Sequence, residues 1–362
     1  MRRIRFLLGI LLILLRAGAW AQESPQPDNS HLKADLEPIA FGFRLDDNVY
    51  RSYLSSGRFT DGIYFLSLGG DLSSRYGVFR GNLGYRLGAD QYQYYSSLSN
   101  LKNSFDLLLS VDPGDFSFFY KKGYFIRASQ YPDFNYSDDN NLLGALWSPE
   151  GPWNYQAKVK YYSREYYDSS PWIKARNFTD RAAFLDVQRE IDEKFSLKLE
   201  GSYNDRRFNR PAYDQFDLPL PSQVIQTDQT WTVLLNAHIY FESILQDITL
   251  ESQRTLSNSY GFSNSVQSVS WAAVVRPVSS LYLQLFFRLY SKTYDAPPLT
   301  DPYLQLGFVD EDGQDLLAVK SSLDLSPEWT MSLSVSRMRN ESTQPGQFYI
   351  KNMLSAQVRR TF

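Results

Sequence analysis

The chain has 362 residues, with 37 basic and 40 acidic side chains, no cysteine, and an aromatic content of 16%. This balance offers no basic surface for nucleic acid, and the lack of cysteine excludes disulfides and thiolate metal sites. Mean hydropathy is −0.40, and no apolar run long enough for a transmembrane helix follows the N-terminal segment, which excludes a helical membrane protein.

The N-terminus has the features of a secretory signal peptide. Three arginines precede the apolar run 6–15, and small residues flank Trp20 at the expected cleavage site. We predict a signal peptide over residues 1–21 and a flexible periplasmic lead-in over the polar, proline-bearing residues 22–38. Without the four arginines of the signal peptide, 33 basic residues face 40 acidic ones, a charge of −7.

From Ile39 onward, apolar and polar residues alternate in successive runs. In one run Trp231, Val233 and Leu235 alternate with Thr232 and Asn236. A period of two predicts a β-strand with one apolar and one polar face. Each run has about the length that a tilted strand needs to cross a bilayer.

Turn residues set the predicted strand count. Short connections rich in Pro, Gly, Asp and Ser are expected at 73–76, 112–115, 148–152, 192–194, 243–247, 277–280 and 326–328. Longer polar links are expected near 54–60, 93–102, 129–138, 167–177, 208–228, 258–263, 293–315 and 340–347. These connections join 16 strands, or 14 or 18 if one hairpin is misassigned. An even number places both termini on the same side.

The last predicted strand, residues 348–362, is apolar on one face and stops on Phe362. A terminal aromatic strand resembles the recognition signal of bacterial outer-membrane β-barrels. The chain departs from that pattern at Gln357, where glycine is favoured, and at Arg360, where an apolar residue is favoured.

This resemblance implies an all-β fold: a transmembrane antiparallel up-and-down β-barrel of about 16 strands over residues 39–362. It also implies the outer membrane of a Gram-negative-type bacterium as the location. The implied partners are outer-membrane lipid and lipopolysaccharide, and the barrel assembly machinery, for which Phe362 is the assembly signal. A soluble β-sandwich would show similar alternation, but the terminal aromatic residue, the signal peptide and the unbroken series of strands favour the barrel.

In such a barrel the polar faces point inward. The expected lumen-lining residues are Arg44, Arg80, Arg86, Asp106, Lys158, Lys160, Lys198, Glu200, His238, Glu242, Arg288 and Lys292. Mixed charges on this wall fit either pairing that stiffens the barrel or solute selectivity, and a small basic excess points to anions. The long links 208–228 and 293–315 either fold inward or pack on one another outside.

The expected function is a porin-like channel for passive passage of small hydrophilic solutes, since a 16-strand barrel is wide enough for an aqueous lumen. One alternative is a barrel component of an exopolysaccharide export assembly, with residues 22–38 as its docking element. Another is a structural barrel around an electron-transfer cytochrome. A homotrimer and an envelope complex both stay open as assemblies. No cofactor, metal or nucleic acid is expected, and no enzyme, because His238 shows no recognisable catalytic motif.

Overall fold

The computed structural model describes residues 32–48, 59–129, 135–167, 170–216, 218–221, 224–296, 315–340 and 349–361. The predicted signal peptide, residues 1–21, and the predicted assembly signal, Phe362, lie outside these ranges. None of the helices in the described part of the chain is long and apolar enough to cross a membrane.

Almost all of the ordered structure is β-strand. The strands are β1 (Leu32–Leu36), β2 (Ile39–Asp46), β3 (Asp61–Tyr76), β4 (Phe79–Tyr92), β5 (Asn100–Val111), β6 (Phe116–Ser129), β7 (Tyr136–Trp147), β8 (Trp153–Tyr166), β9 (Phe178–Asp192), β10 (Phe195–Pro211), β11 (Ile225–Phe241), β12 (Ile244–Ser257), β13 (Asn264–Val278), β14 (Leu281–Tyr294), β15 (Asp315–Asp324), β16 (Trp329–Asn340) and β17 (Tyr349–Arg360). Two short helices, η2 (Ser96–Leu98) and α2 (Pro171–Lys174), lie in links between strands.

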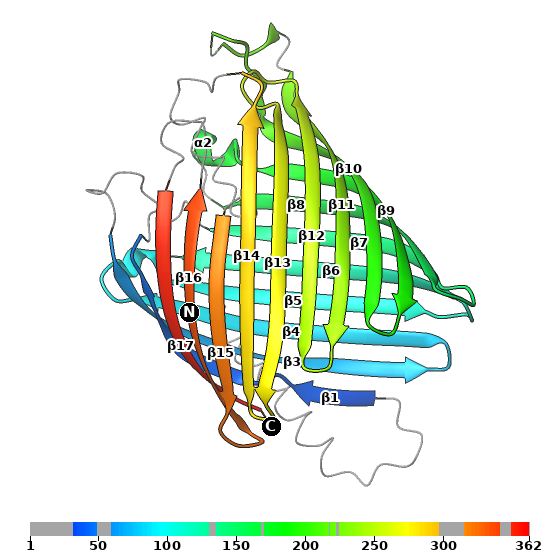
Figure 1. Ribbon diagram of the computed structural model, residues 1–362. Helices are drawn as coiled ribbons and strands as arrows, with labels where there is room; N and C mark the ends of the chain where they lie inside the picture. Colours follow the sequence, from blue (N-terminus) through cyan, green and yellow to red (C-terminus); the bar gives the residue numbers. More distant parts are fainter. Residues whose placement is uncertain are drawn as a thin grey trace.

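Strands β2 to β17 form a closed antiparallel barrel. Each strand pairs with the next in sequence, and the last, β17, pairs with β2 through register partners that include Gln357 with Gly42 and Arg360 with Ile39. Figure 1 shows this continuous wall, with β11–β14 in front and β4–β9 behind. The predicted closed barrel of 16 strands is confirmed.

The short turns lie at one end of the barrel and the longer links at the other. Described short turns occupy residues 77–78, 112–115, 148–152, 193–194, 242–243, 279–280 and 325–328. Two predicted turn positions, 73–76 and 243–247, were wrong by a few residues, because β3 runs on to Tyr76 and β12 already begins at Ile244. Gly77 and Gly114 adopt φ values of 57° and 68° in their turns, a conformation that glycine adopts without steric cost.

The apolar face of the wall is exposed and the polar face is turned inward, the reverse of a protein folded in water. On β11, Trp231, Val233 and Leu235 are exposed on the outer face, whereas Thr232 and Asn236 on the inner face are half-buried. The same alternation is clear on β8 and β16. Because water would drive apolar faces inward, the outer face fits an apolar surrounding.

Aromatic rings gather on the outer face near the short turns. Trp147 stacks on Phe116 at 6.0 Å and on Tyr155 at 5.2 Å between ring centroids. At the same end Arg360 on β17 lies over the Trp329 ring, 5.5 Å from its centroid. Aromatic girdles and basic side chains of this kind mark membrane–water interfaces.

The lead-in predicted to be flexible over residues 22–38 contains ordered structure in its last part. Residues Leu32–Leu36 form β1, which pairs antiparallel with β3 from Gly70 to Ser74. Strand β2 pairs with the other half of β3, so β1 continues that edge beyond the closed wall, at the bottom of Figure 1. The prediction of flexibility is therefore wrong for residues 32–36.

Candidate functional site

The inner face of the barrel is identified by ion pairs between side chains on two strands that are separated by a third strand. Side chains two strands apart start about 10 Å from one another, and only on the concave side of a curved wall do they converge. Among the described residues of the strands, three such pairs are present: Arg44 with Asp90 at 3.9 Å, Lys158 with Glu200 at 3.8 Å, and Arg288 with Glu251 at 3.7 Å. The register then assigns their neighbours at alternate positions to the same face.

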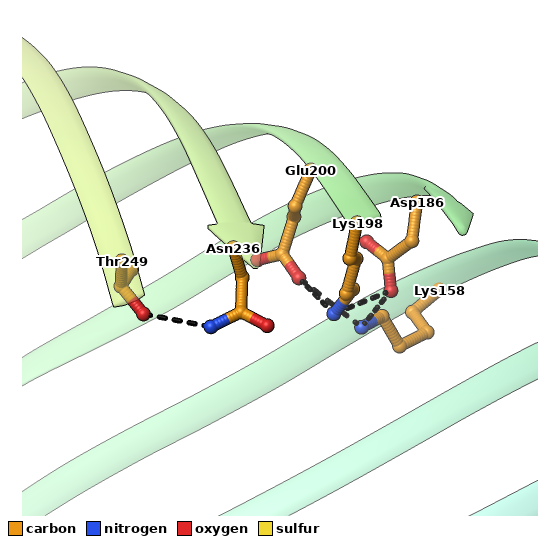
Figure 2. A network of polar contacts seen from close by, with 6 residues as sticks. All are labelled: Lys158, Asp186, Lys198, Glu200, Asn236 and Thr249. Carbon is orange, nitrogen blue, oxygen red and sulfur yellow. Dashed lines mark hydrogen bonds and ion pairs between the residues drawn. The ribbon is translucent and has the colours of Figure 1, made fainter. Parts of the chain in front are cut away.

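Four charged side chains of this face form a network on β8, β9 and β10. Lys158 Nζ lies 2.7 Å from Asp186 Oδ2, and Lys198 Nζ lies 3.4 Å from the same oxygen and 2.9 Å from Glu200 Oε2. Asp186 is only 4% exposed. Figure 2 shows these four side chains projecting from neighbouring strands toward one another. Two cations and two carboxylates thus balance within one compact group.

Beside this network, Asn236 on β11 donates from Nδ2 to Thr249 Oγ1 on β12 at 2.9 Å. The row of polar contacts therefore continues along the wall without a change of net charge. Interlocked donors and acceptors of this kind fix side-chain positions on the inner face.

A second cluster, centred on Arg86 of β4, joins the lead-in to the wall. Its guanidinium donates to Glu37 Oε1 from Nε at 2.7 Å and to Asp106 Oδ2 from Nη1 at 2.9 Å. Asp71 lies 3.8 Å from Nη2. Because Glu37 sits between β1 and β2, this contact ties the segment before the barrel to the inner face.

His238 has an acidic partner that its sequence surroundings did not reveal. Its Nδ1 lies 2.8 Å from Asp247 Oδ1, on the neighbouring strand β12. The sequence predicts a turn over 243–247, so it does not place Asp247 on a strand beside His238; in the structure β12 begins at Ile244. The expectation that the chain is no enzyme stays a prediction. In the described residues, no three His, Cys, Asp or Glu side chains gather in a way that could hold a metal ion.

The structure places the predicted lumen residues as follows. Inner-face positions are occupied by Arg44, Arg80, Arg86, Asp106, Lys158, Lys160, Lys198, Glu200, His238, Arg288 and Lys292. The prediction for Glu242 is wrong, because this residue lies in the β11–β12 turn with a φ of 40° and not on the wall. That these positions line a water-filled lumen remains a prediction.

The aspartates of the inner face that the sequence analysis missed include Asp90, Asp138 and Asp180. Asp138 fell inside a segment read as a loop, and Asp180 follows one directly, although both belong to strands. The signal was available for Asp90, which keeps the alternation of Arg86 on β4.

The link after β10 packs against a neighbouring link. Within the predicted loop 208–228, the backbone N–H of Tyr213 donates to Ser259 Oγ at 3.0 Å. The backbone N–H of Tyr260 donates to the backbone carbonyl oxygen of Tyr213 at 2.9 Å. The described part of this link thus contacts the link between β12 and β13. Most of the other long link, residues 297–314, lies outside the described residues.

Comparison with solved structures agrees with this architecture. An anion-selective porin from Comamonas acidovorans superposes with a TM-score of 0.52 at 11% identity, over 91% of this chain and 100% of that one. In-vitro folded OmpT, an outer membrane protein of Vibrio cholerae, gives 0.52 at 10% identity over 94% and 100%. The fold is that of a porin-like outer-membrane β-barrel. No family model and no curated protein sequence matches the chain.

Proposed function

We propose that this chain is an outer-membrane channel for passive diffusion of small hydrophilic solutes. The observation that carries the proposal is the inverted wall: apolar side chains are exposed on the outer face, and charges such as Lys158 and Asp186 lie on the inner face. Taking a charge out of water costs several kcal/mol, so charges concentrated on the inner face fit a water-filled interior better than an apolar one. A 16-strand barrel leaves room for an aqueous channel.

The backbone arrangement supports an open interior. Each described barrel strand makes its extensive contacts with its two neighbours in the sheet, and not with strands across the barrel. The proposal includes residence in the outer membrane, with contacts to lipid and lipopolysaccharide on the outer face. The aromatic girdle at the short-turn end supports that placement.

Conductance of the purified, refolded protein in planar bilayers tests the proposal. We expect long-lived, uniform current steps, with folding verified by β-type circular dichroism. Folded protein that inserts but carries no current would contradict the diffusion channel. A barrel that opens only with an added envelope partner would favour the export or sheath alternative.

Single cysteines provide a matched control, because the chain has none of its own. Leu234 and Leu235 are neighbours on opposite faces of β11. In lipid vesicles, Leu234→Cys should react with a charged, water-soluble thiol reagent and lose unitary current. Leu235→Cys should be protected by lipid. Equal labelling of both cysteines would contradict a water-filled interior.

A further inference from the structure

Two successive hairpins, β7–β8 and β9–β10, carry the same four-residue arrangement on the inner face. The first arginine set is Tyr136, Asp138, Arg164 and Tyr166; the second arginine set is Phe178, Asp180, Arg206 and Phe208. In both sets the arginine follows the aspartate by 26 residues and is its register partner on the next strand. The second set therefore repeats the first one hairpin later.

The geometry of the two sets is also the same. Arg164 donates to Asp138 from Nε at 2.7 Å and from Nη2 at 2.9 Å. Arg206 donates to Asp180 at the same two distances. Each guanidinium is therefore held in one plane by a bidentate carboxylate, the strongest and most directional pairing available to arginine.

Each clamped guanidinium lies on an aromatic ring. Arg164 is 4.3 Å from the centroid of Tyr136, and Arg206 is 4.4 Å from that of Phe178. The two rings of each set are also alike in spacing and tilt: 5.5 Å and 52° between Tyr136 and Tyr166, against 5.8 Å and 51° between Phe178 and Phe208. Both sets thus form an inner-face surface of one guanidinium and two rings that are tilted against one another.

Further rings make this surface continuous. Tyr162 on β8 lies 5.6 Å from Phe178, and Phe125 on β6 lies 5.8 Å from Tyr136. The surface therefore crosses the wall from β6 to β10. Because the sets are two strands apart, they repeat at about 10 Å across the wall. Arg164 and Arg206 have side chains 28% and 40% exposed, so part of each faces the interior.

The chemistry of the surface selects a type of ligand. Each set contains one cation and one anion, so it offers little net attraction to a small ion. It offers fixed donors beside fixed acceptors, which match hydroxyl groups that both donate and accept hydrogen bonds. It also offers guanidinium planes and the half-buried rings of Tyr136, Tyr166 and Phe178, against which an apolar C–H face packs. Sugar rings combine these two properties, and a chain of them repeats as the sets do.

We infer that the inner face of β6–β10, over the two arginine sets, is a binding path for neutral oligosaccharides. The inference rests on the proposed channel and names its solute class. A chain of sugar rings contacts both sets, whereas a monosaccharide contacts one. Affinity should therefore rise with chain length. Preorganised side chains lose little freedom on binding, which favours such a path over a flexible one.

The test measures binding of glucose, maltohexaose, cellohexaose and chitohexaose in two ways: by calorimetry on the folded protein in detergent, and by block of ion current in bilayers. We expect at least one hexasaccharide to bind at least tenfold more tightly than glucose. The double variant Arg164→Lys with Arg206→Lys keeps both charges but removes the planar guanidinium groups. In this variant the hexasaccharide concentration that blocks half of the ion current should rise at least tenfold. Arg359→Lys, on the inner face of β17 away from the sets, should leave it unchanged.

The two readouts separate the possible failures. A conducting barrel to which no hexasaccharide binds, or whose double variant binds as the parent does, overturns the oligosaccharide path and leaves the channel standing. Binding in detergent by a barrel that never conducts overturns the channel and supports the site. Block by inorganic phosphate but by none of the sugars would replace the proposed path with an anion site. Thermal melts of both variants verify that the barrel is folded.

Discussion

Replacing Lys158 by methionine tests whether the inner-face network stabilises the barrel. The substitution keeps an apolar side chain of similar length and removes the ammonium 2.7 Å from Asp186. Asp186 is 4% exposed, so its carboxylate loses its shortest ion pair with little water to replace it. Removing one partner of a buried pair costs about 3–5 kcal/mol.

The expected cost here is lower, because Lys198 stays 3.4 Å from the same carboxylate oxygen. A charge-assisted hydrogen bond contributes about 1.5–3 kcal/mol, and we expect a loss of about 2 kcal/mol in the free energy of unfolding. Urea unfolding of the protein in short-chain lipid vesicles, followed by tryptophan fluorescence, measures it. The double variant Lys158→Met with Asp186→Asn should recover part of the loss.

Lys33→Met is the matched control, because Lys33 and its partner Asp35 have side chains 72% and 52% exposed. An exposed pair contributes within about 1 kcal/mol. The reasoning is refuted if Lys158→Met costs no more than this control, or if the double variant shows no coupling between Lys158 and Asp186.

Two further predictions concern the barrel seam and an outer link. A Cβ at Gly42 would overlap the backbone oxygen of Ala356 on β17, so Gly42→Ala should destabilise the barrel by about 1–3 kcal/mol. Gly201→Ala, where nothing lies within 4 Å, should not, and equal unfolding midpoints for the two variants would contradict the closed seam. After β14, the Arg254 guanidinium holds the pKa of Asp295 below its ordinary value of 3.8. The stabilisation from this pair is therefore present above pH 3.8 and is lost as the pH falls through the lowered pKa. Carboxyl NMR should show the pKa of Asp295 rising in Arg254→Gln, and an unchanged value would show that the pair has no effect.

The barrel could be predicted from sequence because its signal is local. Alternation such as that of Trp231 to Asn236 fixes strand and face, and Gly and Pro mark most of the turns. The predicted turn positions were wrong where polar residues of the inner face are of the types that are common in turns. Asp247 was read as part of a turn although it faces His238, and Glu242 was read as part of the wall although it makes the turn.

Contacts between distant residues could not be predicted in this way. The pairing of Arg44 with Asp90 depends on wall curvature, and β1 pairs with the part of β3 that extends beyond β2. The arginine sets are an exception, because their spacing repeats in the sequence. An aromatic residue two positions before an aspartate, with an arginine 26 residues later, occurs at Asp138 and again at Asp180. Comparison of the sequence with itself would have revealed this repeat.

We propose that the outer face meets lipid and the inner face meets water. Arginine at Leu235 and at Leu234 tests it most directly, by unfolding free energies in lipid vesicles. Leu235 is exposed on the outer face, so Leu235→Arg should cost about 2–4 kcal/mol. Leu234 lies between Glu200 and Glu251 in register, so Leu234→Arg should cost less than about 1 kcal/mol. Equal costs, or a larger cost at Leu234, would contradict the account.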